Sequence, residues 1–108
     1  MSHFACIVQA DSTADQRRTA LEDRLRSHAA AHGLGDQPTF SWTVAAAGFM
    51  FTEAAPSTSS IISCLVPGPT EYAERERFMR GVCDLWRAET GATDHEIVVS
   101  ITETGPEA

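Results

Sequence analysis

The sequence predicts an α+β fold built as a tandem β-α-β repeat, with four main strands and two helices on one face of the sheet. The first observation is a helix end near Glu89 that Gly91 can close, followed by a strand-like segment at residues 97–101. The second is an earlier segment, residues 32–44, with the same order of helix end, glycine and strand. The third is a set of four identities between positions 58 residues apart: Cys6 and Cys64, Arg17 and Arg75, Gly33 and Gly91, Asp36 and Asp94.

The first unit begins with an apolar strand at His3–Gln9, which is typical of a central position in a sheet. Ser12 and Asp15 resemble a capping box, and a helix is expected over residues 13–32. The side of this helix that faces the sheet is predicted from helical spacing to carry Leu21, Leu25, His28, Ala29 and His32. Apolar and polar residues alternate at 39–44, which predicts the next strand.

The second unit begins with a strand at residues 61–66, which the prolines at 67 and 69 end. Thr70 is a good N-cap for a second helix, and acidic residues in its first turn favour the positive end of the helix dipole. The core side of this helix is predicted to carry Phe78, Met79, Val82, Leu85 and Trp86. The last strand starts at Ile97.

A chain of 108 residues is expected to form a single domain, residues 1–108. The two units occupy residues 1–45 and 60–103, a loop at 46–59 joins them, and residues 104–108 form a tail. So small a domain buries a small core, and contacts with further subunits would stabilise it.

Composition restricts the partners. The net charge is -7 and the sequence contains no lysine, so clusters of positive charge for nucleic acid are absent. Neither a membrane-spanning run nor a signal peptide is expected, which favours the cytoplasm. Three cysteines without metal spacing, Cys6, Cys64 and Cys83, predict reduced thiols, although their reactivity depends on exposure.

Two features of the sequence allow more than one interpretation. His28 and His32 are four residues apart on one helix face, which can hold a metal ion, but no third ligand accompanies them. A favourable contact with the helix dipole is the simpler interpretation, and a place in a pocket is the third for His28. Phe49 and Phe51, beside Gly48, form either a subunit contact, which we favour, or a pocket wall. No cofactor-binding motif occurs, so we expect no cofactor and no metal.

Two architectures share this order of elements. One is the tandem β-α-β fold of the tautomerase superfamily, and the other is the ferredoxin-like fold of dimeric cofactor-free monooxygenases and polyketide cyclases. The segment from Thr90 to Glu103 resembles the helix-turn-strand ending of the tautomerase superfamily. Residues 47–51 resemble the glycine-containing loop after the second strand in cis-3-chloroacrylic acid dehalogenase-like members of that superfamily, which also includes 4-oxalocrotonate tautomerase.

The resemblance implies a homotrimer and cofactor-independent proton transfer by an N-terminal proline, whose amine titrates near neutral pH. This sequence starts with Met1 and Ser2 instead. The resemblance therefore assigns proton transfer to the amine or hydroxyl of Ser2, or to the amine of Met1 if that residue is retained. It assigns an acid-base or hydrogen-bonding role to His28, which lies near the position of a helix-one histidine in some members. It assigns a binding role to Trp42, Phe49, Phe51 and Ser100.

A second departure from the superfamily concerns charge. Close members carry arginines just after the third strand, where they hold a substrate carboxylate. The same turn here, residues 67–71, has no basic residue and ends in Glu71, which would repel an anion. The sequence therefore predicts an isomerase that acts on a small, non-anionic unsaturated carbonyl compound by proton transfer, or by related hydration or cyclisation. The alternatives are a non-catalytic trimeric ligand binder or scaffold, and a ferredoxin-like monooxygenase or cyclase.

Overall fold

The computed structural model describes residues 2–104. The main sheet has the strand order β2-β1-β5-β6. Its strands are β1 (His3–Gln9), β2 (Thr39–Ala45), β5 (Ser60–Val66) and β6 (Ile97–Glu103). The helices are α1 (Thr13–Gln16), α2 (Arg18–Ala31) and α3 (Tyr72–Thr90), with a 3-10 turn at Asp94–Glu96. A small second sheet pairs β3 (Phe51–Thr52) with β4 (Ala55–Pro56) inside the segment that joins the two units.

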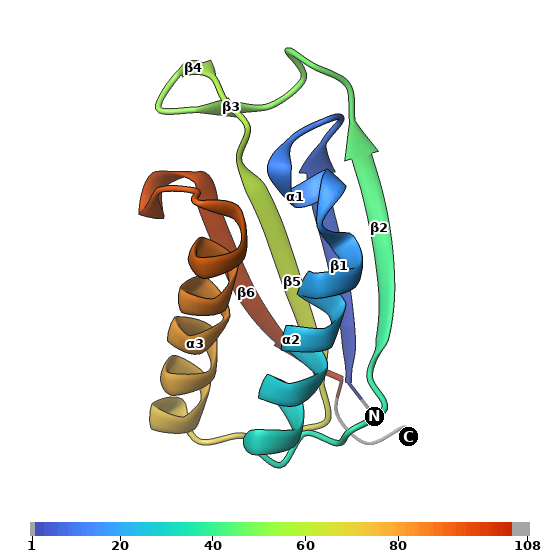
Figure 1. Cartoon of the computed structure of the whole chain (residues 1–108). Coiled ribbons are helices and arrows are strands. Elements are labelled where there is room, and N and C mark those ends of the chain that lie inside the picture. Colours follow the sequence, from blue (N-terminus) through green and yellow to red (C-terminus); the bar gives the residue numbers. More distant parts are fainter. Residues whose placement is uncertain (1, 105–108) are drawn as a thin grey trace.

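The helices α2 and α3 lie side by side on one face of the main sheet (Figure 1). Alternate strand residues point into this layer and are fully buried, among them Phe4, Cys6, Ile62 and Cys64. The helices contribute apolar residues to the same core: Leu21, Leu25, Ala29, Phe78, Val82, Leu85 and Trp86. The predicted α+β class, with two helices on one face of a four-stranded sheet, is confirmed.

The strand order separates the two candidate architectures. Within each unit the two strands are direct neighbours and parallel, β1 with β2 and β5 with β6, whereas β1 and β5 pair antiparallel at the centre. A ferredoxin-like fold splits each β-α-β unit by placing another strand between its two strands. The ferredoxin-like alternative is therefore wrong, and the monooxygenase and cyclase functions lose the fold on which they rested.

The helix starts differ in part from the prediction. Ser12 caps α1 by accepting a hydrogen bond from the Asp15 amide, and the Asp15 carboxylate accepts one from the Asp11 amide, 2.8 Å away. The backbone at Arg17 (φ -115°, ψ 28°) divides the expected long helix into α1 and α2. Thr70 is not the N-cap of α3, because its amide and hydroxyl both donate to the Glu103 carboxylate at the end of β6.

Both helices end at or near a left-handed glycine. Gly33 follows α2 with φ +72° and Gly91 follows α3 with φ +73°, which is the conformation that favours glycine at a helix end. None of the helices in residues 2–104 is long and apolar enough to cross a membrane.

Candidate functional site at the start of β1

One end of the main sheet brings together the start of β1 and the ends of β5 and β6, because β5 runs antiparallel to β1. A cavity of about 330 Å³ opens here between the sheet and the adjoining ends of α2 and α3. Its apolar surface consists of Leu34, Val66, Pro69, Phe78 and Ile101. Its polar rim consists of His32, Thr70, Glu71, Glu74 and Arg75. The site thus combines an apolar floor with charged groups at its mouth.

Ser2 lines a separate, smaller cavity of about 140 Å³, which shares Leu34 with the first. Its side chain is almost fully buried, and its hydroxyl donates a hydrogen bond of 2.8 Å to the carbonyl of Leu34, which lines the cavity. Its own carbonyl accepts from the amide of Thr39 at 3.0 Å, so the residue is fixed on both sides. The hydroxyl proton is therefore already engaged, although the oxygen can still accept a hydrogen bond. Met1 lies outside the described residues.

The polar rim is organised around Thr70. The Glu103 carboxylate accepts from the Thr70 amide at 2.6 Å and from its hydroxyl at 2.7 Å. These two hydrogen bonds, with the positive charge of Arg75, hold the pKa of Glu103 below its usual range. Arg75 donates from Nη1 to the Thr70 carbonyl at 2.6 Å. The charges at this rim therefore partly compensate one another within the protein.

Arg75 is a site residue that sequence reasoning missed. The resemblance predicts a basic residue in the turn at 67–71, and the sequence has none there. Arg75 lies in the first turn of α3, one turn beyond Glu71, and reaches back to the residues before the helix through Thr70. The available signal was its helical spacing of four residues from Glu71, which brings the two onto the same side of the helix.

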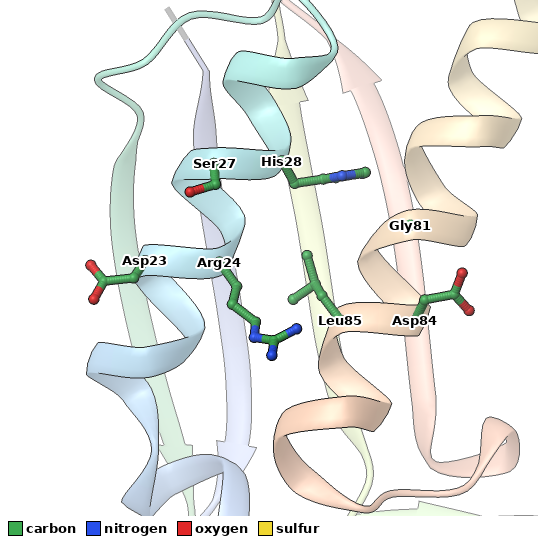
Figure 2. A pocket seen from close by; sticks show the side chains of 7 residues that line it. All are labelled: Asp23, Arg24, Ser27, His28, Gly81, Asp84 and Leu85. Carbon is green, nitrogen blue, oxygen red and sulfur yellow. The ribbon is translucent and has the colours of Figure 1, made fainter.

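His28 does not line this cavity. It lines a separate groove of about 590 Å³ between α2 and α3 and points from α2 toward Gly81 of α3 (Figure 2). Its Nε2 lies 2.9 Å from the carbonyl oxygen of Phe78, and since a carbonyl only accepts, Nε2 carries the proton. Burial lowers the pKa of His28, with the hydrogen bond to Phe78 opposing that shift. His28 is thus a neutral bridge between two helices.

His32, rather than His28, lines the cavity. The two rings lie 4.4 Å apart between centroids, as their spacing on one helix face predicts. Within residues 2–104, no group of three His, Cys, Asp or Glu side chains is arranged to hold a metal ion. Both histidine rings pack against the ring of Phe78, and His28 also donates a hydrogen bond to the Phe78 carbonyl.

Comparison with known proteins addresses the fold. No protein-family model matches the sequence, and no curated protein matches it. Among solved structures, native Ps01740 superposes with a TM-score of 0.86 at 20% identity, over 95% of this chain and 94% of that one. N1, a member of the cis-3-chloroacrylic acid dehalogenase (cis-CaaD) family, gives 0.84 at 12% identity, over 95% and 75%. The Q0 fused 4-OT wild-type symmetric trimer gives 0.83 at 10% identity, over 95% and 85%.

The chain has the tautomerase fold. These structures are tautomerase-superfamily structures, so the architecture expected from the resemblance is confirmed. At identities of 10–20%, these similarities establish the fold alone.

In this tautomerase fold, four further predicted site residues lie away from the cavity of their own chain. Trp42 packs between sheet and helices, where its ring stacks on Trp86 at 6.1 Å and its Nε1 donates to Glu22 at 2.7 Å. Phe49 and Phe51 are 81% and 64% exposed in the segment at the opposite end of the sheet (Figure 1). Ser100 is exposed on β6, paired with Ser63 of β5. One chain therefore does not bring these residues together with Ser2.

Proposed function

We propose that this protein is a tautomerase-superfamily enzyme that moves a proton on a small, non-anionic unsaturated carbonyl compound without an N-terminal proline. The observation that carries the proposal is the cavity of about 330 Å³ near the start of β1, whose lining residue Leu34 accepts a hydrogen bond from the Ser2 hydroxyl. The proton carrier is the α-amine that begins the mature chain, on Met1 or Ser2. An α-amine titrates at about 7.7–8.0 and can accept a proton from an enol hydroxyl and return it to carbon.

The charges around the cavity support a neutral substrate. Glu71 and Glu74 stand at the rim, and the guanidinium there, that of Arg75, is engaged with Thr70. A substrate carboxylate at this mouth would meet two negative charges and a positive charge that is already compensated. The apolar floor instead favours the burial of a hydrocarbon body, at about 25 cal/mol for each Å² removed from water.

We further propose a cytoplasmic homo-oligomer, most simply a trimer. The uncovered face of the sheet carries half-buried or exposed apolar residues that a partner subunit would cover: Ala5, Ile7, Ile61, Leu65 and Val98. Phe49 and Phe51 add apolar surface at one end. The fused 4-OT structures that share the fold are trimers. In such an assembly these two phenylalanines would form a wall at a neighbouring subunit, which keeps their predicted binding role.

The test compares the enol of phenylpyruvate methyl ester with the enol of free phenylpyruvate, on protein whose first residue is known from its intact mass. Ultraviolet absorbance follows conversion of enol to ketone. We expect the ester to be accelerated more than the acid. Since the sequence contains no lysine, N-acetylation converts only the α-amine into an amide, which is not basic, and it should abolish the acceleration.

Two other outcomes decide against the proposal. Acceleration that survives complete blocking of the α-amine would remove the amine from the mechanism. Thermal stabilisation by the ester without any turnover would support the non-catalytic ligand binder instead, a role that the engaged Ser2 hydroxyl would also suit.

A further inference from the structure

Three aromatic rings from α2 and α3 form a cluster behind the cavity. The His28 ring stacks on Phe78 at 4.7 Å with an interplanar angle of 23°, and it lies 4.4 Å from the His32 ring. His32 in turn meets the edge of Phe78 at 5.5 Å. Phe78 and His32 line the cavity, whereas His28 lines the groove on the outer side of the helices. His28 therefore contacts the cavity only through the other two rings.

The position of His28 is held from two directions. Its Nε2–H donates to the Phe78 carbonyl at 2.9 Å, which ties the ring to the backbone of α3. Across the ring stands Gly81, where an added Cβ would lie 2.5 Å from Nε2 of His28 and closer still to Cε1. Glycine inside a helix costs about 0.5–1 kcal/mol relative to alanine. Here it leaves the room that the histidine ring needs between the helices (Figure 2).

We infer that His28 is a positioning residue, which holds the Phe78 ring and the His32 ring against the cavity, rather than a catalytic residue. The inference rests on the proposed function for the identity of the ligand, but its structural part stands without turnover. The stacked His28 ring occupies the space behind Phe78, so that the phenylalanine keeps one orientation toward the cavity. Phe78 also packs on Phe4 of β1 at 6.2 Å, which links the cluster to the strand that begins at the site.

The experiment uses His28→Ala, which removes the ring, and His28→Gln, whose amide can still donate to the Phe78 carbonyl. His95→Ala is the matched control, because His95 is exposed in the 3-10 turn and contacts Glu53 rather than the cluster. The first readout needs no ligand: NMR signals of the Phe78 ring and of the Leu34 and Ile101 methyl groups, which line the cavity. The second is the kcat and KM of the full chain for the enol of phenylpyruvate methyl ester.

We expect His28→Ala to shift the cavity signals, His28→Gln to shift them less, and His95→Ala to leave them in place. We expect the KM of His28→Ala to rise about five- to tenfold, with kcat within a factor of about two, because the lost contact shapes the binding surface and touches no reacting atom. Unmoved cavity signals in a folded His28→Ala protein would overturn the inference whether or not the enzyme turns over. A kcat loss of more than about tenfold at constant KM would overturn it in favour of a catalytic histidine.

Gly81 supplies an independent check. Gly81→Ala should displace the His28 ring and shift the same NMR signals, because its Cβ occupies the place of Cε1. In the double variant with His28→Ala the clash is gone, so the added alanine should cause no further shift. If Gly81→Ala shifts the cavity signals equally with and without the histidine, the effect of the added Cβ does not reach the cavity through His28. The inference then fails.

Discussion

Arg75 contributes less positive charge to the cavity than its place on the rim implies. Its Nη1 donates to the Thr70 carbonyl, and its guanidinium lies 5.7 Å from the centroid of the Tyr72 ring. Glu103 shares the same threonine and is held ionised by it. Charged side chains that satisfy one another stabilise the local structure and leave little field for an anionic ligand. In the proposed function, the chemistry at this end of the sheet would therefore depend on the shape of the cavity and on the α-amine.

The pKa of His28 predicts how stability changes with pH. Above its ordinary pKa of about 6.5 the histidine is neutral in both folded and unfolded chains. As the pH falls below that value, the unfolded chain takes up a proton that burial makes the folded chain resist, so the free energy of unfolding decreases. We expect the urea midpoint to fall between about pH 7.5 and about pH 5, and to fall less in His28→Gln. An equal fall in both proteins would show that His28 is not the source of the effect.

The cysteines should differ in reactivity. Burial raises the pKa of Cys6 and of Cys64 to about 12, whereas Cys83 is half-buried and its pKa is raised by partial burial. Only the thiolate reacts. With iodoacetamide at about pH 8, we expect Cys83 to be alkylated first, and the other two to react only after denaturation. Peptide mass spectrometry measures the order, and early labelling of Cys6 would show that the core opens.

At the scale of elements, α2 and α3 are joined by polar as well as apolar contacts. Glu89, near the end of α3, accepts from Arg17 at 2.6 Å and from Arg24 at 2.7 Å. These surface pairs lower the pKa of Glu89 through hydrogen bonds and charge. Because the side chains of Arg17 and Arg24 are about half exposed, at 48% and 49%, solvent weakens these ion pairs. The packing of the two helices therefore depends mainly on the buried apolar cluster beneath them.

Substitutions of Gly91, the glycine that ends α3, test whether its left-handed conformation is needed there. Gly91 has φ +73°, and a Cβ added to it would meet no atom within 4 Å, so a substitution there changes backbone strain without a clash. We expect Gly91→Ala to destabilise the protein by about 1 kcal/mol, because an L-residue in this conformation costs about 1–2 kcal/mol. Gly91→Asn should cost less, because asparagine tolerates the left-handed region. Urea denaturation measures both, and equal losses would mean that conformation is not the cause.

At the scale of the whole molecule, helices cover one face of the sheet, and the other face is open in the single chain. Each unit ends its helix at a left-handed glycine, and the two units meet along β1 and β5. We propose that they are a repeat, which places the cavity at one end of the sheet and the exposed phenylalanines at the other. A contact between unlike ends is heterologous, and such contacts close into rings when the rotation allows.

Charge placed on the uncovered face should separate subunits. Ile7 lies on β1 in the middle of this face, and Ile7→Glu would bury a carboxylate in any interface formed there. We expect light scattering to give a multiple of 11.7 kDa for the unaltered protein and the mass of one chain for the variant. Ser27→Glu, on the outer side of α2, is the control and should keep the larger mass. An unaltered protein that is already monomeric would remove the proposed oligomer.

The sequence by itself determined the order of the four main strands and two long helices, the class of fold and the glycine stops. Those features depend on near neighbours: alternation within residues 39–44, helical spacing in α3, and the freedom of Gly91 to take a left-handed conformation. Sequence reasoning missed the short strands β3 and β4 in the segment that was expected to be a loop. Ser2 was assigned to the site by the resemblance to the tautomerase superfamily, and its role in proton transfer stays a prediction. The long first helix was predicted without its division at Arg17, since one backbone angle interrupts the pattern without changing its period.

The tertiary structure alone decided the strand order, which residues line the cavity, and where His28 lies. These depend on contacts between residues far apart in the chain, such as Ser2 with Leu34, Thr70 with Glu103, and His28 with Phe78. Both histidines lie on the same face of α2, so helical spacing could not tell which one lines the cavity. The approach of α3 at Gly81 made that choice, because it takes His28 into the helix groove and leaves His32 at the site.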